Sequence, residues 1–451
     1  MSNPKFKVIV IGGGPVGLTA AHALSQAGID YVVLENRLSV TTDVGASLVL
    51  WPHGLRVLAQ LGLLKPLREI SVGMCRTQSL TLDGEKYRDS HVLDVIKNNH
   101  GSRQTIFHRA HLLRVLHENL SEADKACILT GKKVTDIVVS PDGVEARCAD
   151  GSTYHGSIII GADGTHSKVR QSMRELALKA SASKVNKEQP YLSEYRALWC
   201  TFPRQAGFET GDAIDIHGDD VSLQCIVGQD RSWIFLYERL ETPTGDRVTY
   251  SRDDVEAFAA RFGEHAISEH LKVKDVFEKR YTAGMANLEE GIVKHWSWNR
   301  IVLVGDACHK FTPNQGLGYN NGIQDVARLV SELHRIVPVD NSASLPVGTL
   351  TKAFSRYQTS RMKAVRKDLK SSAGTTRMSV WSSWTYYVLD RHLLPSLTLV
   401  EGKMVSLMMG STISKGPILD FMEGEEPFEG KVPWKNRIAA PKKSTPKALY
   451  P

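Results

Sequence analysis

The sequence predicts an α/β fold, and three observations support this. Val8–Ile11 is a short apolar run typical of a buried strand, and the glycine turn Gly12–Gly17 follows it directly. A helical stretch begins at Leu18, and a second apolar run, Tyr31–Leu34, ends in the acid Glu35. A strand, a G-x-G-x-x-G turn, a helix and a strand ending in an acid, in this order, predict a Rossmann-like βαβ unit that binds a dinucleotide.

Each part of this unit has a physical role. Gly12 permits the sharp turn, Gly14 lets backbone N–H groups approach a pyrophosphate, and Gly17 lets the helix pack closely on the sheet. The positive end of the helix faces the phosphate charge, and Glu35 can accept hydrogen bonds from a ribose hydroxyl. An isolated glycine motif could be a plain structural loop. The strand, helix and acid in register favour nucleotide binding.

Composition excludes several classes of protein. The chain has 451 residues, 42% of them hydrophobic and 23% charged, which is typical of a globular protein of about two or three domains. The formal charge of +7 is spread out, so we predict a solvated surface and no nucleic-acid partner. The 6 cysteines are far apart without a C-x-x-C pair, so we predict no metal site.

The two ends of the chain suggest where the protein resides. Lys5 and Lys7 directly precede the first strand and leave no room for a signal peptide, so we expect a cytoplasmic protein. The aromatic stretch Val380–Met409 is interrupted by charged residues, so none of its apolar runs is long enough to span a membrane. Packing against the protein body explains it most simply, with peripheral membrane contact as the alternative. The Pro- and Lys-rich end, 441–451, predicts a disordered tail.

The middle of the chain predicts helices and a small antiparallel sheet. Apolar residues at helical spacing predict helices around Trp51–Leu63 and His111–Leu116. Val134–Val139 and Val144–Cys148 alternate on either side of Pro141–Gly143, which predicts a hairpin.

A change of pattern divides the chain into domains. From about 190 to 290 the strands alternate, which favours a sheet that covers the nucleotide site, and Arg300–Val304 then returns to the fully apolar type. The predicted organisation is a nucleotide-binding domain in two pieces at 1–190 and 291–345, a β-sheet substrate-covering domain at 191–290, and a helical C-terminal region with the tail at 346–451.

Three apolar strands end in a glycine or acid turn: at Gly12–Gly17, at Gly161–Gly164 and at Gly305–Asp306. Ligands of open α/β sheets bind at the carboxyl ends of the strands. We therefore expect these three turns to converge on one extended cofactor.

With these three motifs, the chain resembles the FAD-dependent monooxygenases of the aromatic-hydroxylase type. The matching segments are Gly12–Gly17, Asp163–Arg170 and Gly305–His309, and the resemblance covers roughly residues 5–335. It implies that FAD is the cofactor, that NAD(P)H reduces it, and that one atom of O2 enters the substrate while the other leaves as water. No second glycine motif of this type is present for the nicotinamide, which fits transient docking of NAD(P)H.

The resemblance also implies roles for individual residues toward FAD. Glu35 would hold the adenosine ribose, Arg109 would lie beside the pyrophosphate and ribityl chain, and Asp306 would hydrogen-bond the ribityl chain. Gly45 to Val49 would line the flavin side of the next strand.

Further residues would lie along the flavin ring or in a shared motif. Pro313, Gly318 and Tyr319 belong to a segment that would run past the isoalloxazine ring. Asp163 and Arg170 would serve the motif shared by FAD and NAD(P)H, where Asp163 would mostly maintain structure.

The segment Phe311–Asp325 departs from the commoner family pattern at Leu317 and Tyr319 and is similar to the fungal natural-product branch. That branch includes epoxidases that oxidise the terminal alkene of prenylated aromatic or indole intermediates in meroterpenoid and indole-diterpene pathways. The resemblance therefore implies a small, hydrophobic, prenylated substrate.

Two residues of the covering sheet are candidates for catalysis. Within the branch, an arginine at the position of Arg196 faces the flavin, where its fork of donors could stabilise an oxyanion, although it could also be a surface residue. His217 ends an alternating strand and could donate a proton or be a plain strand-end histidine. Two alternatives to an epoxidase remain: a hydroxylase of an aromatic ring, and a non-catalytic carrier of prenylated proteins on the same fold.

Overall fold

A six-stranded sheet carries the nucleotide-binding unit in the computed structural model, which describes residues 5–43, 47–340, 344–396 and 398–441. Its strand order is β18-β19-β12-β1-β2-β8, and β19, β12, β1, β2 and β8 are parallel. The strands are β1 (Lys7–Ile11), β2 (Asp30–Leu34), β8 (Ile128–Leu129), β12 (Ile158–Gly161), β18 (Ser297–Trp298) and β19 (Ile301–Leu303). The predicted α/β fold is confirmed, because distant pieces of the chain complete one sheet.

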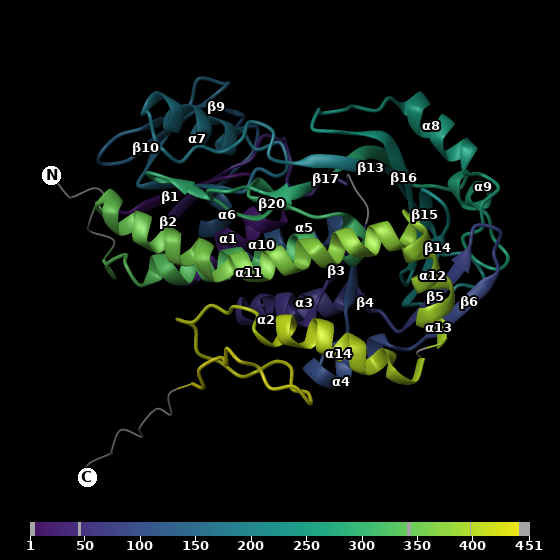
Figure 1. Ribbon diagram of the computed structural model, residues 1–451. Coiled ribbons are helices and arrows are strands. Elements are labelled where there is room, and N and C mark those ends of the chain that lie inside the picture. Colours follow the sequence, from purple (N-terminus) through teal and green to yellow (C-terminus); the bar gives the residue numbers. More distant parts are fainter. Residues whose placement is uncertain (1–4, 44–46, 341–343, 397, 442–451) are drawn as a thin grey trace, which may run out of the picture.

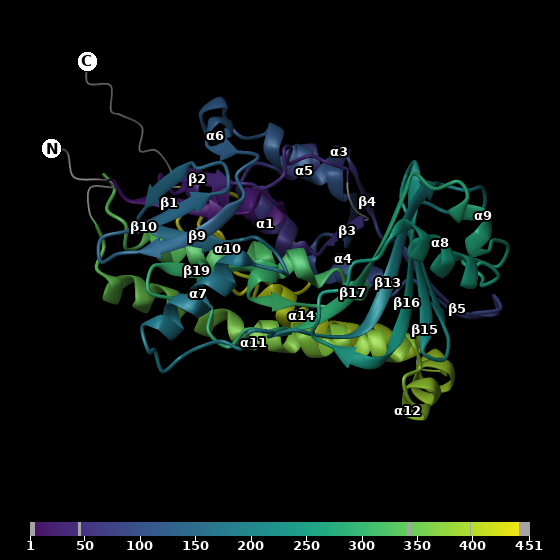
Figure 2. The same ribbon diagram turned by 90° about the horizontal axis from the view of Figure 1, so that it is seen from above.

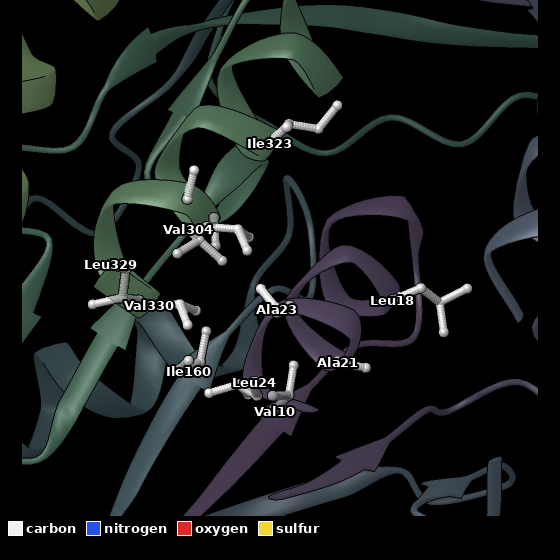
Figure 3. Close-up of a cluster of buried hydrophobic side chains, with 14 of the residues drawn as sticks. Val10, Leu18, Ala21, Ala23, Leu24, Ile160, Val304, Ile323, Leu329 and Val330 are labelled. Atoms are coloured by element: carbon white, nitrogen blue, oxygen red, sulfur yellow. The ribbon is translucent and has the colours of Figure 1, made fainter. Parts of the chain in front are cut away.

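Two helices cover the centre of this sheet, α1 (Pro15–Gln26) and α10 (Leu317–His334). Figure 3 shows side chains of α1 and α10 packed together over Val10 of β1 and Ile160 of β12. Each large aliphatic side chain buried here stabilises the fold by roughly 1.5–3 kcal/mol. This core fixes the strand ends at which a cofactor would bind.

An eight-stranded sheet forms the second layer, in the order β20-β17-β13-β16-β15-β14-β5-β6. Two helices pack on its outer face, on the side away from α1 (Figure 2). The strands are β5 (Arg76–Thr81), β6 (Lys86–Ser90), β13 (Leu192–Pro203), β14 (Asp212–His217), β15 (Val221–Val227), β16 (Arg231–Thr244), β17 (Thr282–Ile292) and β20 (His309–Lys310), and the helices are α8 (Arg252–Arg261) and α9 (Val273–Phe277). We call the face toward the nucleotide-binding body the inner face.

The predicted boundary at residue 190 is wrong for one hairpin. β5 and β6 come from the first segment of the chain, yet β5 pairs in parallel with β14 and extends the covering sheet. Ser79 and Leu80 of β5 lie opposite Asp215 and Ile216 of β14. The two polar side chains therefore lie on one face of the sheet, and the two apolar side chains lie on the other. The covering domain is therefore built from two separated stretches.

Smaller elements follow the predictions closely. The helices expected near Trp51 and His111 are α2 (Pro52–Gln60) and α5 (Arg109–Glu118), and the expected hairpin is β9 (Val134–Val139) with β10 (Val144–Cys148). The remaining elements of this part of the chain are β3 (Ser47–Leu50), β4 (Ser71–Gly73), β7 (Thr105–His108), β11 (Thr153–Gly156), α3 (Leu64–Glu69), α4 (Leu93–His100), α6 (Glu122–Ala126), α7 (Lys168–Lys179) and two 3-10 turns, η1 (Gly305–Ala307) and η2 (Pro313–Gln315).

The C-terminal region is helical, as predicted. The long helix α11 (Val347–Ser379) runs across the body toward the covering sheet (Figure 1). It is followed by α12 (Trp384–Val388), a turn of π-helix at Leu389–Leu393, α13 (Leu394–Ser396) and α14 (Thr398–Ser414), which packs on α4. Among the described helices, none is long and apolar enough to cross a membrane. The tail predicted at 441–451 lies, apart from Pro441, outside the described residues.

Candidate functional site

The three predicted turns meet at one edge of the six-stranded sheet. Ile11 of β1 pairs with Gly161 of β12, and Gly161 pairs with Leu303 of β19, so the turns that follow lie side by side. Gly12 has φ of +107°, and a Cβ placed there would lie 2.5 Å from the backbone oxygen of Ala162. Their expected convergence is confirmed.

The first turn leaves an open space at the start of α1. A Cβ placed on Gly17 would lie 1.8 Å from the backbone oxygen of Gly12, so the helix approaches the turn as closely as two backbones allow. A Cβ placed on Gly14 would meet nothing within 4 Å, and no side chain caps the helix there. Uncapped N–H groups and the positive end of the helix dipole therefore face free space, which suits a pyrophosphate.

Glu35 lies at the end of β2 and is 8% exposed. Its Oε2 accepts a hydrogen bond from the backbone N–H of Gly13 at 2.6 Å, and its Oε1 accepts one from that of Arg37 at 2.8 Å. An ionised carboxylate accepts about four hydrogen bonds, so Glu35 can still bind a ribose hydroxyl.

Arg109 begins α5 and lies partly buried near this turn. Burial lowers the pKa of its guanidinium, and the nearby charge of Arg37 adds to that, while Asp306 and Glu35 act in the opposite direction. Within the described part of the chain the guanidinium makes no hydrogen bond or ion pair. A partly buried cation with no partner in the described part of the chain fits a site that receives an anion.

Asp306 lies in η1, at the end of β19. Burial would raise the pKa of its carboxyl, but Lys310, whose Nζ lies 2.5 Å from Oδ2, holds that pKa below its usual value. Thr165 also donates to Oδ2, at 3.4 Å. Asp306 is therefore ionised at neutral pH and can accept hydrogen bonds from sugar hydroxyls. A Cβ placed on Gly318 would lie 3.6 Å from Oδ1, so the start of α10 faces this carboxylate.

Asp163 is tied into the fold. It accepts hydrogen bonds from Ser167 Oγ at 2.6 Å and from the backbone N–H of Val169 at 3.0 Å, and it thereby caps α7. Burial raises the pKa of its carboxyl. Arg170 donates to the carbonyl of Ala307 at 3.0 Å and so joins this turn to the third strand end. Both residues hold turns together, and their role toward a nicotinamide stays a prediction.

The segment predicted to pass the flavin ring adjoins β3. The carbonyl of Val49 accepts from Asn320 Nδ2 at 2.8 Å, which joins β3 to the start of α10, and Pro313 begins η2. The Tyr319 hydroxyl lies 2.9 Å from Thr19 Oγ1, so its side chain is held against α1. Gly45 lies outside the described residues.

Arg196 does not face the cofactor site, contrary to the sequence-based expectation. Its guanidinium pairs with Glu238 on the neighbouring strand β16, with Nη2 and Oε2 2.6 Å apart, and lies over the ring of Phe258 in α8, 5.3 Å from its centroid. Glu238 also pairs with Arg261 of α8. The physical reason is strand alternation: Arg196 shares its face with Leu198, which packs under α8 on the outer side.

We therefore expect Arg196→Ala to keep FAD and turnover. The variant loses an ion pair and a ring contact between the covering sheet and α8, which should lower the free energy of unfolding by on the order of 1 kcal/mol. Thermal unfolding and the ratio of product to consumed O2 measure the two effects. A well-folded variant that forms hydrogen peroxide instead of product would contradict this assignment and restore the catalytic one.

His217 does lie on the inner face. It shares this face of β14 with Asp215 and with Ala213, which packs against Ile106 of β7. Asp215 accepts from Gln224 Nε2 at 2.9 Å, and Gln224 also donates to the carbonyl of Asn314 in η2 at 3.3 Å. His217 is thus two residues along its strand from the point where the covering sheet touches η2.

Sequence reasoning missed a buried network beneath η1. Asp325 of α10 accepts from the backbone N–H of Gly305 at 3.0 Å, from His309 Nε2 at 2.6 Å and from Arg361 Nε at 2.8 Å. His309 supports the Asp306 turn through Asp325, which contacts both His309 and the backbone of Gly305. Arg361 of α11 gave no local signal, since it is 36 residues from its partner.

The inner face carries an aromatic wall that the sequence did not assign. Tyr195 and Tyr237 are each 1% exposed, and within the described residues neither hydroxyl has a hydrogen-bond partner. Burial raises the pKa of Tyr195 to about 12 and that of Tyr237 further, so both are neutral phenols. The wall consists of Tyr195, Ala197, Trp199, Trp233, Phe235, Tyr237 and Leu288.

Comparison with known proteins agrees with this geometry. The model of the FAD binding domain family matches residues 5–343. The chain belongs to this family. The FAD-dependent monooxygenase srdH of Neurospora crassa is 33% identical over 96% of this chain and 99% of its own length, and penE of Penicillium thymicola is 31% identical over 94% and 88%.

The solved structures share the fold. HpxO of Klebsiella pneumoniae, complexed with FAD and uric acid, aligns with a TM-score of 0.72 at 22% identity over 91% of this chain and 97% of its own. Tetracycline destructase Tet(55) aligns with a TM-score of 0.65 at 16% identity over 93% and 99%.

The protein is an FAD-dependent monooxygenase of the type found in fungal secondary metabolism, and the resemblance stated from sequence is confirmed. The alternative of a non-catalytic carrier is set aside. The site fits FAD: the open space at Gly14 and the guanidinium of Arg109, which has no partner among the described residues, match the pyrophosphate, while the carboxylates of Glu35 and Asp306 match the sugar hydroxyls.

Proposed function

We propose that this monooxygenase takes electrons from NAD(P)H and epoxidises an alkene of a small prenylated molecule. The observation that carries the proposal is the aromatic wall on the inner face, which lies on the same side of the covering sheet as η2. An apolar chain gains roughly 25 cal/mol for each Å² that it buries against such a surface. Bound FAD would supply the hydride and oxygen chemistry, and the protein holds the substrate and excludes water.

The tyrosines of the wall favour an alkene over a phenolate as the reacting group. Hydroxylation of a phenol is assisted by a base beside the ring hydroxyl, whereas Tyr195 and Tyr237 have raised pKa values, stay protonated and therefore cannot be that base. Epoxidation of an alkene needs no such base. The aromatic-ring hydroxylase remains the alternative that the experiment distinguishes.

The test is incubation of the FAD-loaded protein with NADPH, isotopically labelled O2 and a panel of prenylated phenols and indoles. We expect one labelled oxygen atom in the product, with the label in the prenyl chain, and conversion of that product to a diol in dilute acid. NADH in place of NADPH measures the coenzyme preference. A label on the aromatic ring would contradict epoxidation and support the hydroxylase.

Peripheral membrane contact is a further part of the proposal. Among the described residues of the C-terminal region, four large apolar side chains are exposed, namely Trp384 at 76%, Leu393 at 50%, Met404 at 37% and Leu407 at 81%. Exposed aromatic and aliphatic side chains on surface helices favour binding to the membrane interface, where a hydrophobic substrate would concentrate. Co-sedimentation with phosphatidylcholine vesicles tests it, and a Trp384→Ser and Leu407→Ser double variant that sediments like the wild type would contradict it.

A further inference from the structure

A buried carboxylate joins the covering sheet to the C-terminal region. Asp390 is 0% exposed, and its Oδ2 lies 2.6 Å from Nδ1 of His217. The same oxygen accepts hydrogen bonds from the Tyr87 hydroxyl at 2.7 Å and from Trp381 Nε1 at 2.9 Å. Burial of an isolated carboxylate is costly, and these three donors stabilise the buried carboxylate of Asp390.

Three local irregularities meet at this carboxylate. Asp390 lies within the turn of π-helix at Leu389–Leu393. Trp381 has φ of +40°, in the left-handed region that a tryptophan rarely adopts. Tyr87 has no register partner in the β5–β6 ladder, where a bulge occurs. π-turns, left-handed residues and bulges are individually unfavourable and are concentrated at functional sites.

The hydrogen bonds fix which nitrogen of His217 is free. Burial would raise the pKa of Asp390, but the hydrogen bond and charge of His217, with Trp381 and Tyr87, hold it below its usual value, so the carboxylate only accepts. The Tyr87 hydroxyl also lies 2.8 Å from Nδ1, but it donates its hydrogen to Asp390, so Nδ1 must carry the hydrogen that Asp390 accepts. Within the described residues Nε2 of His217 has no hydrogen-bond partner. A histidine oriented in this way presents a defined nitrogen to a ligand.

The free nitrogen belongs to the inner face of the covering sheet. His217 follows Asp215 on the same face of β14 by two residues, or about 7 Å. Asp215 adjoins Gln224, which contacts η2. A substrate that lies along the aromatic wall with its reacting end at η2 would therefore place a second end near His217.

We propose that Nε2 of His217 is the polar anchor of the substrate, that it hydrogen-bonds an oxygen of an otherwise apolar molecule, and that Asp390 is the positioning residue that holds the imidazole. The ligand class is an apolar, alkene-bearing molecule with one hydroxyl group remote from the alkene, and this hydroxyl donates its hydrogen to Nε2. This inference rests on the proposed function for the alkene. It gives His217 a role in binding in place of the proton donor considered from sequence.

The test compares two probes that differ by one hydroxyl group, 2-farnesylphenol and farnesylbenzene. Each is titrated into the oxidised, FAD-loaded protein, and the change in flavin absorbance gives its dissociation constant. Because a buried hydrogen bond is at stake, we expect the wild type to bind the phenol on the order of 10-fold more tightly than the hydrocarbon. His217→Phe should bring this ratio to about one, and Asp390→Asn should lower it while the hydrocarbon binds as before.

Ser222→Ala is the matched control, because Ser222 of β15 is the register partner of His217 in β14 and is also buried, so the ratio should stay at the wild-type value. A ratio of one in the wild type, or an equal loss of both probes in His217→Phe and Asp390→Asn, would overturn the anchor. Both probes must therefore bind to the wild type. Lack of binding by both would also overturn the anchor. Turnover is followed on the same samples. If the wild type prefers the phenol but forms no epoxide, the proposed epoxidation alone is wrong. If it forms epoxide without preferring the phenol, the anchor alone is wrong.

Discussion

Asp306→Ala is expected to yield a folded protein that purifies largely without FAD. The carboxylate is held ionised by Lys310 and lies where β19 ends, beside the start of α10. Its removal takes away an acceptor for the sugar hydroxyls and leaves Lys310 without its partner. Loss of a charge-assisted hydrogen bond costs about 1.5–3 kcal/mol, which corresponds to roughly a 10- to 150-fold weaker dissociation constant for FAD. The ratio of flavin to protein absorbance and a titration with FAD measure it.

Asp150→Ala is the matched control for this variant. Asp150 also pairs with a lysine, Lys132, at 2.6 Å, but on the surface and away from the strand ends. It should retain FAD at the wild-type level. Asp306→Ala with wild-type FAD content would remove Asp306 from the cofactor site, whereas equal loss in both variants would indicate general destabilisation.

The sequence predicted the nucleotide-binding half well because its signals are local. The glycine turn, its strand and Glu35 lie within one short stretch, and the backbone geometry at Gly12 and Gly17 requires glycine at those two positions. The convergence of three turns also followed, since parallel strands present their carboxyl ends at one edge. Local chemistry and a general rule of topology were sufficient there.

The face of Arg196 could not be predicted in the same way. In a strand with one buried face, the alternation of polar and apolar residues shows which side is buried. β13 is apolar on both faces, because α8 and α9 cover one face and the nucleotide-binding body covers the other. A register shift between Ser193 and Tyr195 further disturbs the alternation just before Arg196. A one-residue change of register reverses the face of every side chain.

Contacts between distant segments were equally out of reach. His217 and Asp390 are 173 residues apart, and the assignment of β5 and β6 to the covering sheet depends on pairing with β14. Asp390 stands in a stretch whose aromatic residues suggested packing or membrane contact rather than a buried carboxylate. Such partners are set by tertiary packing, so no local pattern in the sequence predicts them.

Gly17→Ala should destabilise the fold more than any other glycine-to-alanine substitution in the Gly12–Gly17 turn. Its Cβ would lie 1.8 Å from the backbone oxygen of Gly12, and neither backbone can yield without moving α1 or the turn after β1. We expect a loss of about 3 kcal/mol or more in the free energy of unfolding, a large share of the 5–15 kcal/mol typical of a domain, together with loss of FAD.

Gly14→Ala separates the two consequences. A Cβ there meets no atom of the protein within 4 Å, and the backbone is extended at φ −71°, so the variant should unfold within about 1 kcal/mol of the wild type. The added methyl group enters the space assigned to the pyrophosphate, so FAD affinity should still fall. Denaturant unfolding of the cofactor-free proteins, with FAD titration of each, tests both. If Gly14→Ala bound FAD like the wild type, the pyrophosphate would have to lie elsewhere than at the start of α1.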